Sequence, residues 1–460
     1  MSGPSSRSRL AEQALRGAET IAALATAPGR AALATIRVSG PGAHSIGAAC
    51  VRPWPLAPRV ATLAVIRHPG SRDVADSALA TWFPAPRSFT GEDVLEVTTH
   101  GGTIAPSSVL AAFVRAGARP AGAGEFTRRA VLNGKLDLLQ AEAIGDLIDA
   151  TSGVLHRAAL AQLSGALTGR ISALRKALID LEALLAYDID FPEEDDGPVA
   201  SSQVSELCRM VQRGIEQLLS TLPVAQLGRS GAVVVLAGVP NSGKSSLFNA
   251  LIGEQRAIVT EHPGTTRDAI DVFIEAEPYP WRLVDTAGLR DATDPVERLG
   301  VEVSGQWLAR ADVVLICGKR APDRSTAEAG IRGRTGAAVV RVQTMVDTTE
   351  CEAGADVVVS AVTGQGLDAL RQFVGETLAE RHPRPPADVP VITRARHESA
   401  LAQACAELTL FLAAWESRAL PATIAATHVH AAVLALDSLI GAVDTEDVLD
   451  WVFARFCVGK

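Results

Sequence analysis

The chain has 460 residues, 47% of them hydrophobic, and a net charge of −9. This length exceeds what one hydrophobic core supports, so several domains are expected. No run of about 18 uncharged apolar residues is present to form a membrane span, and the acidic balance argues against a protein that coats nucleic acid by bulk electrostatics. The six cysteines lack a close pair and predict a reducing, cytoplasmic setting without disulfides or a zinc site.

Lysine is rare in this chain. It accounts for five of the 43 basic residues, and these lie at positions 135, 176, 244, 319 and 460. Where a chain otherwise chooses arginine, a lysine indicates a position that needs a compact ammonium group.

The N-terminal part is predicted to be a flexible extension, residues 1–19, followed by an α+β domain, residues 20–133. The early Ser and Arg residues of the extension are soon followed by acids, which disfavours a targeting peptide. The domain has one helical pattern near 106–116 and short β-rich runs at 20–27, 32–40, 60–68, 77–83 and 93–100. Arg37 and Glu96 lie in these runs, with Lys135 just beyond, and each taken alone is more often a surface residue.

Apolar residues at helical spacing occupy two further blocks, 134–228 and 381–460. Neither block forms a complete bundle alone. We therefore expect one discontinuous helical domain, with residues 229–380 inserted into it as a separate domain. The acidic segment 190–198 is interpreted as a solvated linker.

The inserted domain begins with a phosphate-loop motif. A β-branched apolar run, 232–237, leads into Gly238-x-x-x-x-Gly243-Lys244-Ser245 and then a helical pattern. Backbone N–H groups of such a loop wrap phosphates, Lys244 neutralises the outer phosphates, and Ser245 reaches Mg²⁺. Later apolar runs alternate with helical stretches, which predicts a doubly wound parallel sheet.

Two further segments supply the rest of a nucleotide switch. "DTAG" places Asp285 at the end of a strand, where a carboxylate can hold the water shell of the metal, and Gly288 can follow a γ-phosphate. In "HPGTTRD", Thr266 is the expected second hydroxyl ligand of Mg²⁺.

Guanine selection usually depends on Asn-Lys-x-Asp, but this chain has Thr344-Met345-Val346-Asp347 in that place. Asp347 can still accept from the guanine N–H donors, whereas the lysine that covers the base is replaced by Met345. Losing such a charged partner costs about 1.5–3 kcal/mol. GTP remains the expected nucleotide, with weaker binding, and Ser360 and Ala361 lie where a backbone N–H can contact the base.

The residues alone offer two candidates for the catalytic groups. Leu289 stands where a water-orienting Gln would follow "DTAG". Asn241 could help to bind a monovalent cation in place of an arginine finger, and Glu297 could position water, although as a single residue Glu297 is more often a solvated helix position.

The order of "GEFTRRAVLNGKLDLLQ", "GVPNSGKSSLFNAL", "GTTRD", "DTAGLR" and the terminal "FCVGK" resembles the MnmE/TrmE tRNA modification GTPases from about residue 20 to the end. The resemblance implies a multidomain α/β protein. Its parts are an N-terminal α+β folate-binding domain, a discontinuous α-helical domain, and an inserted Ras-like P-loop GTPase domain with a doubly wound sheet.

The resemblance also implies a K⁺-stimulated GTPase that modifies C5 of the wobble uridine of tRNA to aminomethyl or carboxymethylaminomethyl derivatives. It would act as a homodimer and in a heterotetramer with an MnmG/GidA-type flavoprotein, which would carry the FAD. The one-carbon donor would be 5-formyl- or 5,10-methylene-tetrahydrofolate, held by Arg37, Glu96, Lys135 and Lys460 with Cys457 beside it, either as a nucleophile or as a packed thiol.

In the nucleotide site, the resemblance assigns Ser245 and Thr266 to Mg²⁺, and Glu297 to orienting water. The residues implied around K⁺ are Asn241, Thr260, His262 and Thr265. The residues expected to contact GTP are Asn241, Ser242, Gly243, Lys244, Ser245, Ser246, Thr260, Thr265, Thr266, Asp285, Thr286, Ala287, Gly288, Asp347, Ser360 and Ala361.

Two alternatives remain open. One is a regulatory or ribosome-assembly GTPase without one-carbon chemistry, although such proteins typically add a basic RNA-binding module. The other is a member of the family that keeps the folate scaffold and binds guanine weakly.

Overall fold

The computed structural model describes residues 19–190, 201–253, 271–285, 305–386, 388–417 and 421–441, together with Phe456, Val458 and Gly459. The chain divides into two compact units, Met1–Gly145 with Asp437–Lys460, and Asp146–Leu436. Each unit is described by itself.

A seven-stranded sheet forms the centre of the first unit within the described residues, in the order β3-β4-β5-β6-β2-β1-β7. Neighbours are antiparallel except β1 and β7, which are parallel. The strands are β1 (Ile21–Leu24), β2 (Leu33–Ser39), β3 (Val51–Arg52), β4 (Thr62–Arg67), β5 (Val74–Phe83), β6 (Val94–His100) and β7 (Arg119–Pro120). The five β-rich runs predicted from the sequence correspond to β1, β2, β4, β5 and β6.

Alternating side chains of these strands enter two cores. On one face, Ile36, Ile66 and Leu95 pack with residues of helices α2 (Ala43–Cys50) and α3 (Ile104–Arg115). A smaller cluster of Ile21, Ala23, Ala121 and Phe126 includes helix α4 (Glu125–Leu132). Helix α3 corresponds to the helical pattern in the sequence, whereas α2 has no clear pattern because it is only 8 residues long. Helix α5 (Leu138–Asp149) follows.

The second unit contains a six-stranded sheet among its described residues, in the order β13-β12-β11-β8-β10-β9. Its strands are β8 (Ala232–Gly238), β9 (Asp271–Ile274), β10 (Trp281–Asp285), β11 (Val313–Gly318), β12 (Ala338–Gln343) and β13 (Val357–Val358). The pairs are parallel except β9 with β10, which is antiparallel. The predicted all-parallel sheet is therefore extended by an antiparallel edge strand, because β9 and β10 are close enough in sequence to form a hairpin.

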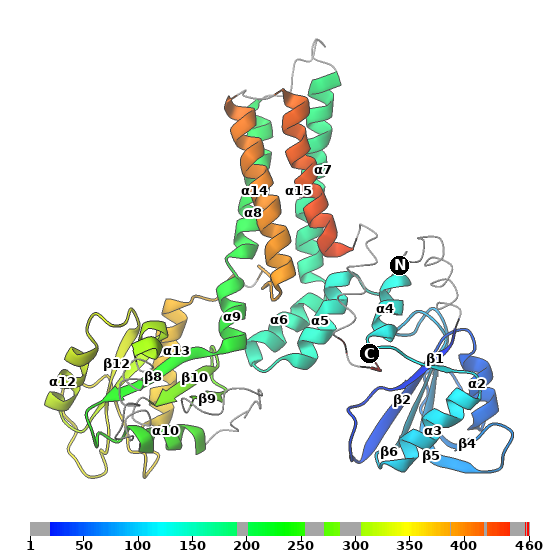
Figure 1. Cartoon of the computed structure of the whole chain (residues 1–460), viewed down its shortest axis with the longest axis horizontal. Helices are drawn as coiled ribbons and strands as arrows, with labels where there is room; N and C mark the ends of the chain where they lie inside the picture. Colours follow the sequence, from blue (N-terminus) through cyan, green and yellow to red (C-terminus); the bar gives the residue numbers. More distant parts are fainter. Residues whose placement is uncertain are drawn as a thin grey trace, which may run out of the picture. The chain divides into compact units, whose positions relative to one another are not determined.

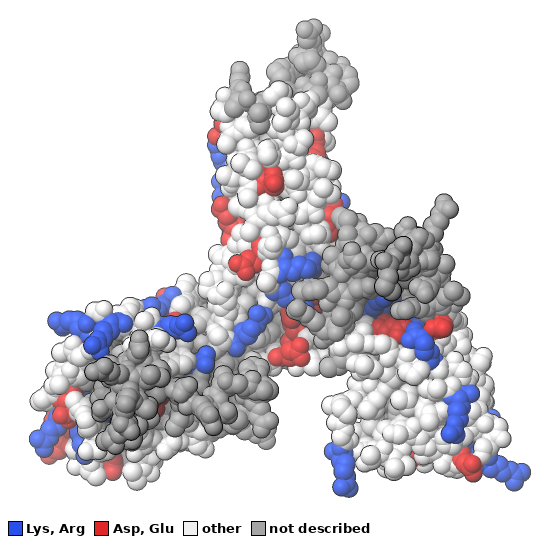
Figure 2. All heavy atoms as spheres, viewed as in Figure 1, with Lys and Arg blue, Asp and Glu red and all other residues white. Residues whose placement is uncertain are grey.

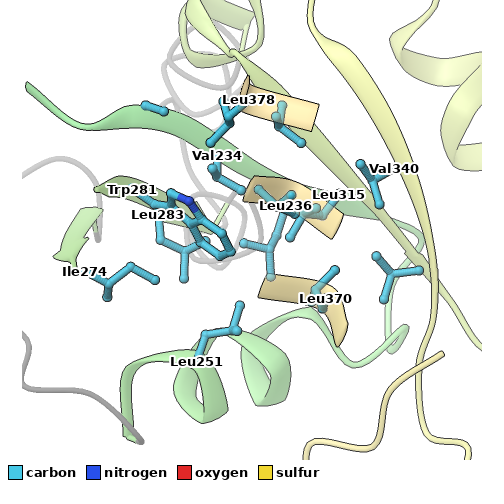
Figure 3. Close-up of a cluster of buried hydrophobic side chains, with 14 of the residues drawn as sticks. Val234, Leu236, Leu251, Ile274, Trp281, Leu283, Leu315, Val340, Leu370 and Leu378 are labelled. Atoms are coloured by element: carbon cyan, nitrogen blue, oxygen red, sulfur yellow. The ribbon is translucent and has the colours of Figure 1, made fainter. Parts of the chain in front are cut away.

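Both faces of this sheet are buried, which explains its continuous apolar strands. Figure 3 shows one face, where Val234, Leu236 and Leu315 pack with Leu251 and Leu370. Leu251 belongs to helix α10 (Lys244–Gly253) and Leu370 to α13 (Leu367–Arg381). The opposite face is covered partly by Ile331 of helix α12 (Ala321–Ile331) and by Leu308. This packing holds the carboxyl ends of the parallel strands together at one edge of the sheet.

The helices of the second unit that lie outside the sheet domain come from both sides of it in sequence. They are α6 (Gly153–Leu163), α7 (Ala166–Asp190), α8 (Ser201–Leu219), α9 (Leu222–Ser230), α14 (Ala395–Ser417) and α15 (Ala422–Ile440). Helices α7, α8, α14 and α15 lie side by side (Figure 1), and His430 Nδ1 of α15 is 3.0 Å from Glu182 Oε1 of α7. The structure thus has the predicted discontinuous helical domain, with the six-stranded sheet domain inserted into it in sequence.

Helix α15 is unusually apolar. By length and composition, its stretch Thr423–Ile440 could cross a membrane, and 44% of that stretch is buried. It also contacts α14, since His428 Nδ1 lies 2.7 Å from Glu407 Oε2. A core helix of a helical bundle has the same composition, so the stretch alone does not identify a membrane segment.

Figure 2 shows charged side chains of both signs on one face of the described part of the chain. The upper part of the helical bundle carries few of them on this face.

Candidate functional site

The phosphate loop lies between β8 and α10, at the carboxyl edge of the sheet. A Cβ atom on Gly238 would lie 2.3 Å from the Cys317 carbonyl oxygen, so only glycine permits the close approach of β8 to β11 there. Gly243 has φ +81°, a conformation that favours glycine. Helix α10 begins directly after it, and its N-terminal N–H groups face the loop, which is the arrangement that binds phosphate.

Lys244 is held over this loop. Its side chain is buried, and Nζ donates to the carbonyl oxygens of Gly238 at 3.1 Å and Val239 at 2.9 Å. These bonds place a buried positive charge beside the N-terminus of α10, so the loop is electrostatically prepared for an anion.

Ser245, which is predicted to bind Mg²⁺, lies next to Asp285, which is predicted to hold the water shell of the metal. Ser245 Oγ donates to Asp285 Oδ2 at 2.8 Å, joining the first turn of α10 to the end of β10. A hydroxyl and a carboxylate at this distance form the type of oxygen donor set that Mg²⁺ and its water shell require. The structure therefore fits the predicted metal.

The segment predicted to recognise the base follows β12. Thr344 Oγ1 donates to the Ser242 carbonyl oxygen at 2.7 Å, which ties this segment to the phosphate loop. Asp347 Oδ1 accepts a hydrogen bond of 2.6 Å from Ser360 Oγ. The structure thus brings together Asp347 and Ser360, with Ala361 next in the chain. The hydrogen bond from Thr344 to Ser242 was not predicted from the sequence, although the threonine hydroxyl at this position could have suggested it.

A cleft of about 760 Å³ lies beside the phosphate loop. Its lining contains the predicted nucleotide residues from Asn241 to Ser246, together with Met345. Asn241 has φ +59°, which turns the loop at that residue. The lining also contains Lys319, which belongs to none of the predicted sites.

Cys317 lies beneath this loop and is fully buried. Burial raises the pKa of its thiol to about 12. The thiol therefore stays protonated at neutral pH and is a packing group.

A second set of predicted residues meets in the first unit. Arg37 on β2 and Glu96 on β6 are register partners, and Arg37 Nη2 lies 2.7 Å from Glu96 Oε1. The Arg37 guanidinium also lies 5.0 Å from the ring centre of Phe89 and 5.6 Å from that of Phe126. A guanidinium beside two aromatic rings makes cation–π contacts in addition to its ion pair.

Lys135 belongs to the same unit, where its Nζ donates to the Pro86 carbonyl oxygen at 3.2 Å. Its stem lies near Gly91, since a Cβ there would be 3.2 Å from Lys135 Cγ. The loop 84–93 therefore carries both Phe89, beside Arg37, and the contacts of Lys135.

The described residues of the C-terminus also contact this unit. Val458 forms an antiparallel bridge with Ala123, and a Cβ atom on Gly459 would lie 2.1 Å from the Leu24 carbonyl oxygen. Leu24 is the register partner of Ile36, the residue before Arg37. The apolar tail is therefore packed against β1 close to the Arg37–Glu96 pair.

The remaining predicted site residues lie outside the described residues. They are Thr260, His262, Thr265, Thr266, Thr286, Ala287, Gly288, Glu297, Cys457 and Lys460.

Comparison with known proteins gives matches to both parts of the chain. The model of the MnmE helical domain matches residues 138–457, and that of the GTP-binding protein TrmE N-terminus matches residues 20–135. The tRNA modification GTPase MnmE of Azoarcus sp. (strain BH72) is 40% identical over 98% of this chain and 100% of its own. The protein of the same name from Heliobacterium modesticaldum is 39% identical over 96% of this chain and 99% of its own.

Solved structures give a weaker match. The G domain of the T. maritima FeoB iron transporter is 25% identical, with a TM-score of 0.26, and covers 32% of this chain and 98% of its own. That TM-score is too low to support an argument.

Proposed function

Because the chain belongs to the MnmE family of tRNA modification GTPases, we propose that it hydrolyses GTP in the course of modifying C5 of the wobble uridine of tRNA. The products at the uridine are aminomethyl or carboxymethylaminomethyl derivatives.

The meeting of Lys244, Ser245 and Asp285 at the phosphate loop is the observation that carries the GTPase proposal. Lys244 neutralises the outer phosphates, while Ser245 binds Mg²⁺ with Thr266 and Asp285 holds its water shell. Mg²⁺ supplies charge neutralisation between the β- and γ-phosphates. Asp347 accepts from the guanine N–H donors and selects GTP over ATP.

In the proposed reaction, Glu297 orients the attacking water. The proposed K⁺ site consists of Asn241, Thr260, Thr265 and the His262 backbone, where the ion would supply the positive charge of an arginine finger. The position of Asn241 in the lining of the cleft supports this assignment.

The one-carbon donor, 5-formyl- or 5,10-methylene-tetrahydrofolate, is proposed to bind at the Arg37–Glu96 pair with Lys135 and Lys460. Arg37 of this pair lies close to the rings of Phe89 and Phe126, and the described tail residues Val458 and Gly459 pack in the same unit, which supports this assignment. These residues suit a flat, polar ring with a charged tail. Cys457, next to Val458 in the chain, is the proposed nucleophile.

The proposed assembly is a cytoplasmic homodimer formed through the N-terminal domain, joined by an MnmG/GidA-type flavoprotein that carries FAD. The proposed domains are 1–19 (extension), 20–133 (folate binding and dimerisation), 134–228 and 381–460 (helical) and 229–380 (GTPase).

Nucleotide turnover by the purified chain tests this proposal. We expect hydrolysis of GTP but not ATP, and much faster hydrolysis in K⁺ than in Na⁺ buffer. No GTP turnover by the folded chain in either salt would overturn the GTPase proposal. A tetrahydrofolate titration then separates tRNA modification from a purely regulatory GTPase, which would not bind folate.

A further inference from the structure

The base-recognition segment has a methyl group where a cation is usual. Met345 adopts φ +59° and its side chain leans over the phosphate loop, since a Cβ on Gly243 would lie 3.1 Å from the Met345 terminal methyl carbon. A thioether can cover one face of a base, but it supplies no hydrogen-bond donor. The positive charge normally present at this end of a guanine site is therefore missing from position 345.

Lys319 lies at the end of the neighbouring strand. Gly318, the last residue of β11, is the register partner of Gln343 at the end of β12, and its carbonyl oxygen accepts from the Thr344 backbone N–H at 3.2 Å. Lys319 therefore leaves the sheet edge at the level of Thr344 and Met345. Both Lys319 and Met345 line the cleft beside the phosphate loop.

The chemistry of Lys319 also suits a binding role. It is one of only five lysines in a chain with 43 basic residues, and it is partly buried. Among the described residues, no hydrogen bond or ion pair engages its ammonium group, in contrast with Lys244, which is held by loop carbonyls. A lysine that serves only as a solvated surface residue has no reason to line the nucleotide cleft, as Lys319 does.

We infer that Lys319 supplies, from the end of β11, the ammonium that position 345 lacks in the guanine-nucleotide site. Its aliphatic stem lies along the cleft, and its ammonium donates to oxygen atoms of the ribose while Met345 covers the base. Lys319 thus helps to hold the nucleotide. The lysine that is absent at Met345 is replaced by a lysine at the end of the neighbouring strand β11. This inference rests on the proposed GTPase function.

Calorimetric titration of the full chain with GDP and with ADP tests the inference. Lys319→Met is expected to weaken GDP binding by about 10- to 100-fold, as for loss of a charged hydrogen-bond donor. Adding Met345→Lys to that variant is expected to restore GDP affinity to within about threefold of the original chain. Met345→Lys alone is expected to have little effect, because the ammonium is already present.

Lys176→Met, the same substitution at an exposed lysine of α7, is the matched control and is expected to leave GDP affinity unchanged. Thermal unfolding of each variant shows whether it is folded. The inference is overturned if folded Lys319→Met binds GDP as the original chain does, or if the double variant is as weak as Lys319→Met. If the original chain itself does not bind GDP, the proposed function fails first and this inference fails with it.

Discussion

At the scale of single residues, Asp347 has the clearest predicted role. Its carboxylate accepts from the Ser360 hydroxyl, and the segment that carries it is tied to the phosphate loop by Thr344. The carboxylate is therefore held by its neighbours, so a change in its hydrogen-bonding character should alter base choice without disturbing the fold.

Asp347→Asn is expected to exchange the preferred base. The amide donates where the carboxylate accepts, so it matches the 2-oxo group of xanthine and loses the bond to the guanine amino group. We expect GTP affinity to fall by about 10- to 100-fold while XTP affinity rises. Competitive titration with both nucleotides measures this. Asp368→Asn, on an aspartate whose side chain is 99% exposed, is the control, and retained GTP preference in Asp347→Asn would contradict the role.

Glu125 has a pKa that its neighbours shift, so its ionisation affects the stability of the first unit. Burial raises the pKa of its carboxyl, but hydrogen bonds from Arg119, the Gly122 N–H and Arg129 outweigh burial and hold the pKa below its ordinary value. A carboxyl with a depressed pKa in the folded state stabilises that state above the unfolded pKa, about 4.3 for Glu. This stabilisation disappears as the pH falls through the folded pKa.

Glu125→Gln is accordingly expected to lower the free energy of unfolding by about 1.5–3 kcal/mol at pH 7. The difference from the original chain should shrink below about pH 4.3 as the carboxyl becomes protonated. Urea unfolding of both chains across this pH range provides the measurement. Asp73→Asn, at an exposed residue of the same unit, should change stability by less than about 0.5 kcal/mol. A pH-independent difference for Glu125→Gln would exclude the ionic explanation.

At the scale of elements, the described residues of the C-terminal tail pack against the rest of the first unit. The bridge between Val458 and Ala123 and the close approach of Gly459 to Leu24 hold its backbone. Gly459 has φ +99°, so two separate requirements, conformation and space, select glycine there.

Gly459→Ala is expected to displace the tail, because the new Cβ would overlap the Leu24 carbonyl oxygen at 2.1 Å. Since Lys460 follows directly, we expect tetrahydrofolate affinity to fall by at least about 10-fold, the loss of one charged hydrogen bond. Gly117→Ala is a close control, because Gly117 has φ +112° with nothing within 4 Å of its Cβ position. Equal folate affinity in Gly459→Ala and the original chain would remove the tail from the proposed site.

At the scale of the whole molecule, the helical domain is assembled from segments far apart in the chain. Contacts such as Glu182 with His430 join helices on either side of the inserted GTPase domain in sequence. We therefore expect the inserted domain to bind and release nucleotide while these contacts keep the two segments of the helical domain together. Dimerisation, which we assign to the N-terminal domain, should then be independent of nucleotide.

Light scattering of the full chain is expected to give twice the chain mass of 48.0 kDa both with and without GDP. Lys244→Met should abolish nucleotide binding and remain dimeric, because Lys244 lies in the phosphate loop and not in the N-terminal domain. A single-chain mass without nucleotide, or dissociation of Lys244→Met, would place the dimer contact elsewhere.

The amino-acid sequence by itself determined most strand runs of both sheets, but not β3, β7 or β9. It also determined the phosphate loop and the helical character of the two flanking blocks. These features depend on residues close together in the chain: apolar periodicity for β2 and β11, and glycine and lysine spacing for the loop from Gly238 to Lys244. The identity of Asp347 and Ser360 as candidates also followed from local motifs.

Only the tertiary structure decided how distant segments complete each site. The antiparallel β9, the meeting of Lys319 and Met345 in one cleft and the packing of Gly459 against Leu24 all join residues whose local sequences carry no signal of their meeting. Such contacts depend on strand order and register, which arise from burying the two faces of each sheet and not from the spacing of residues along the chain.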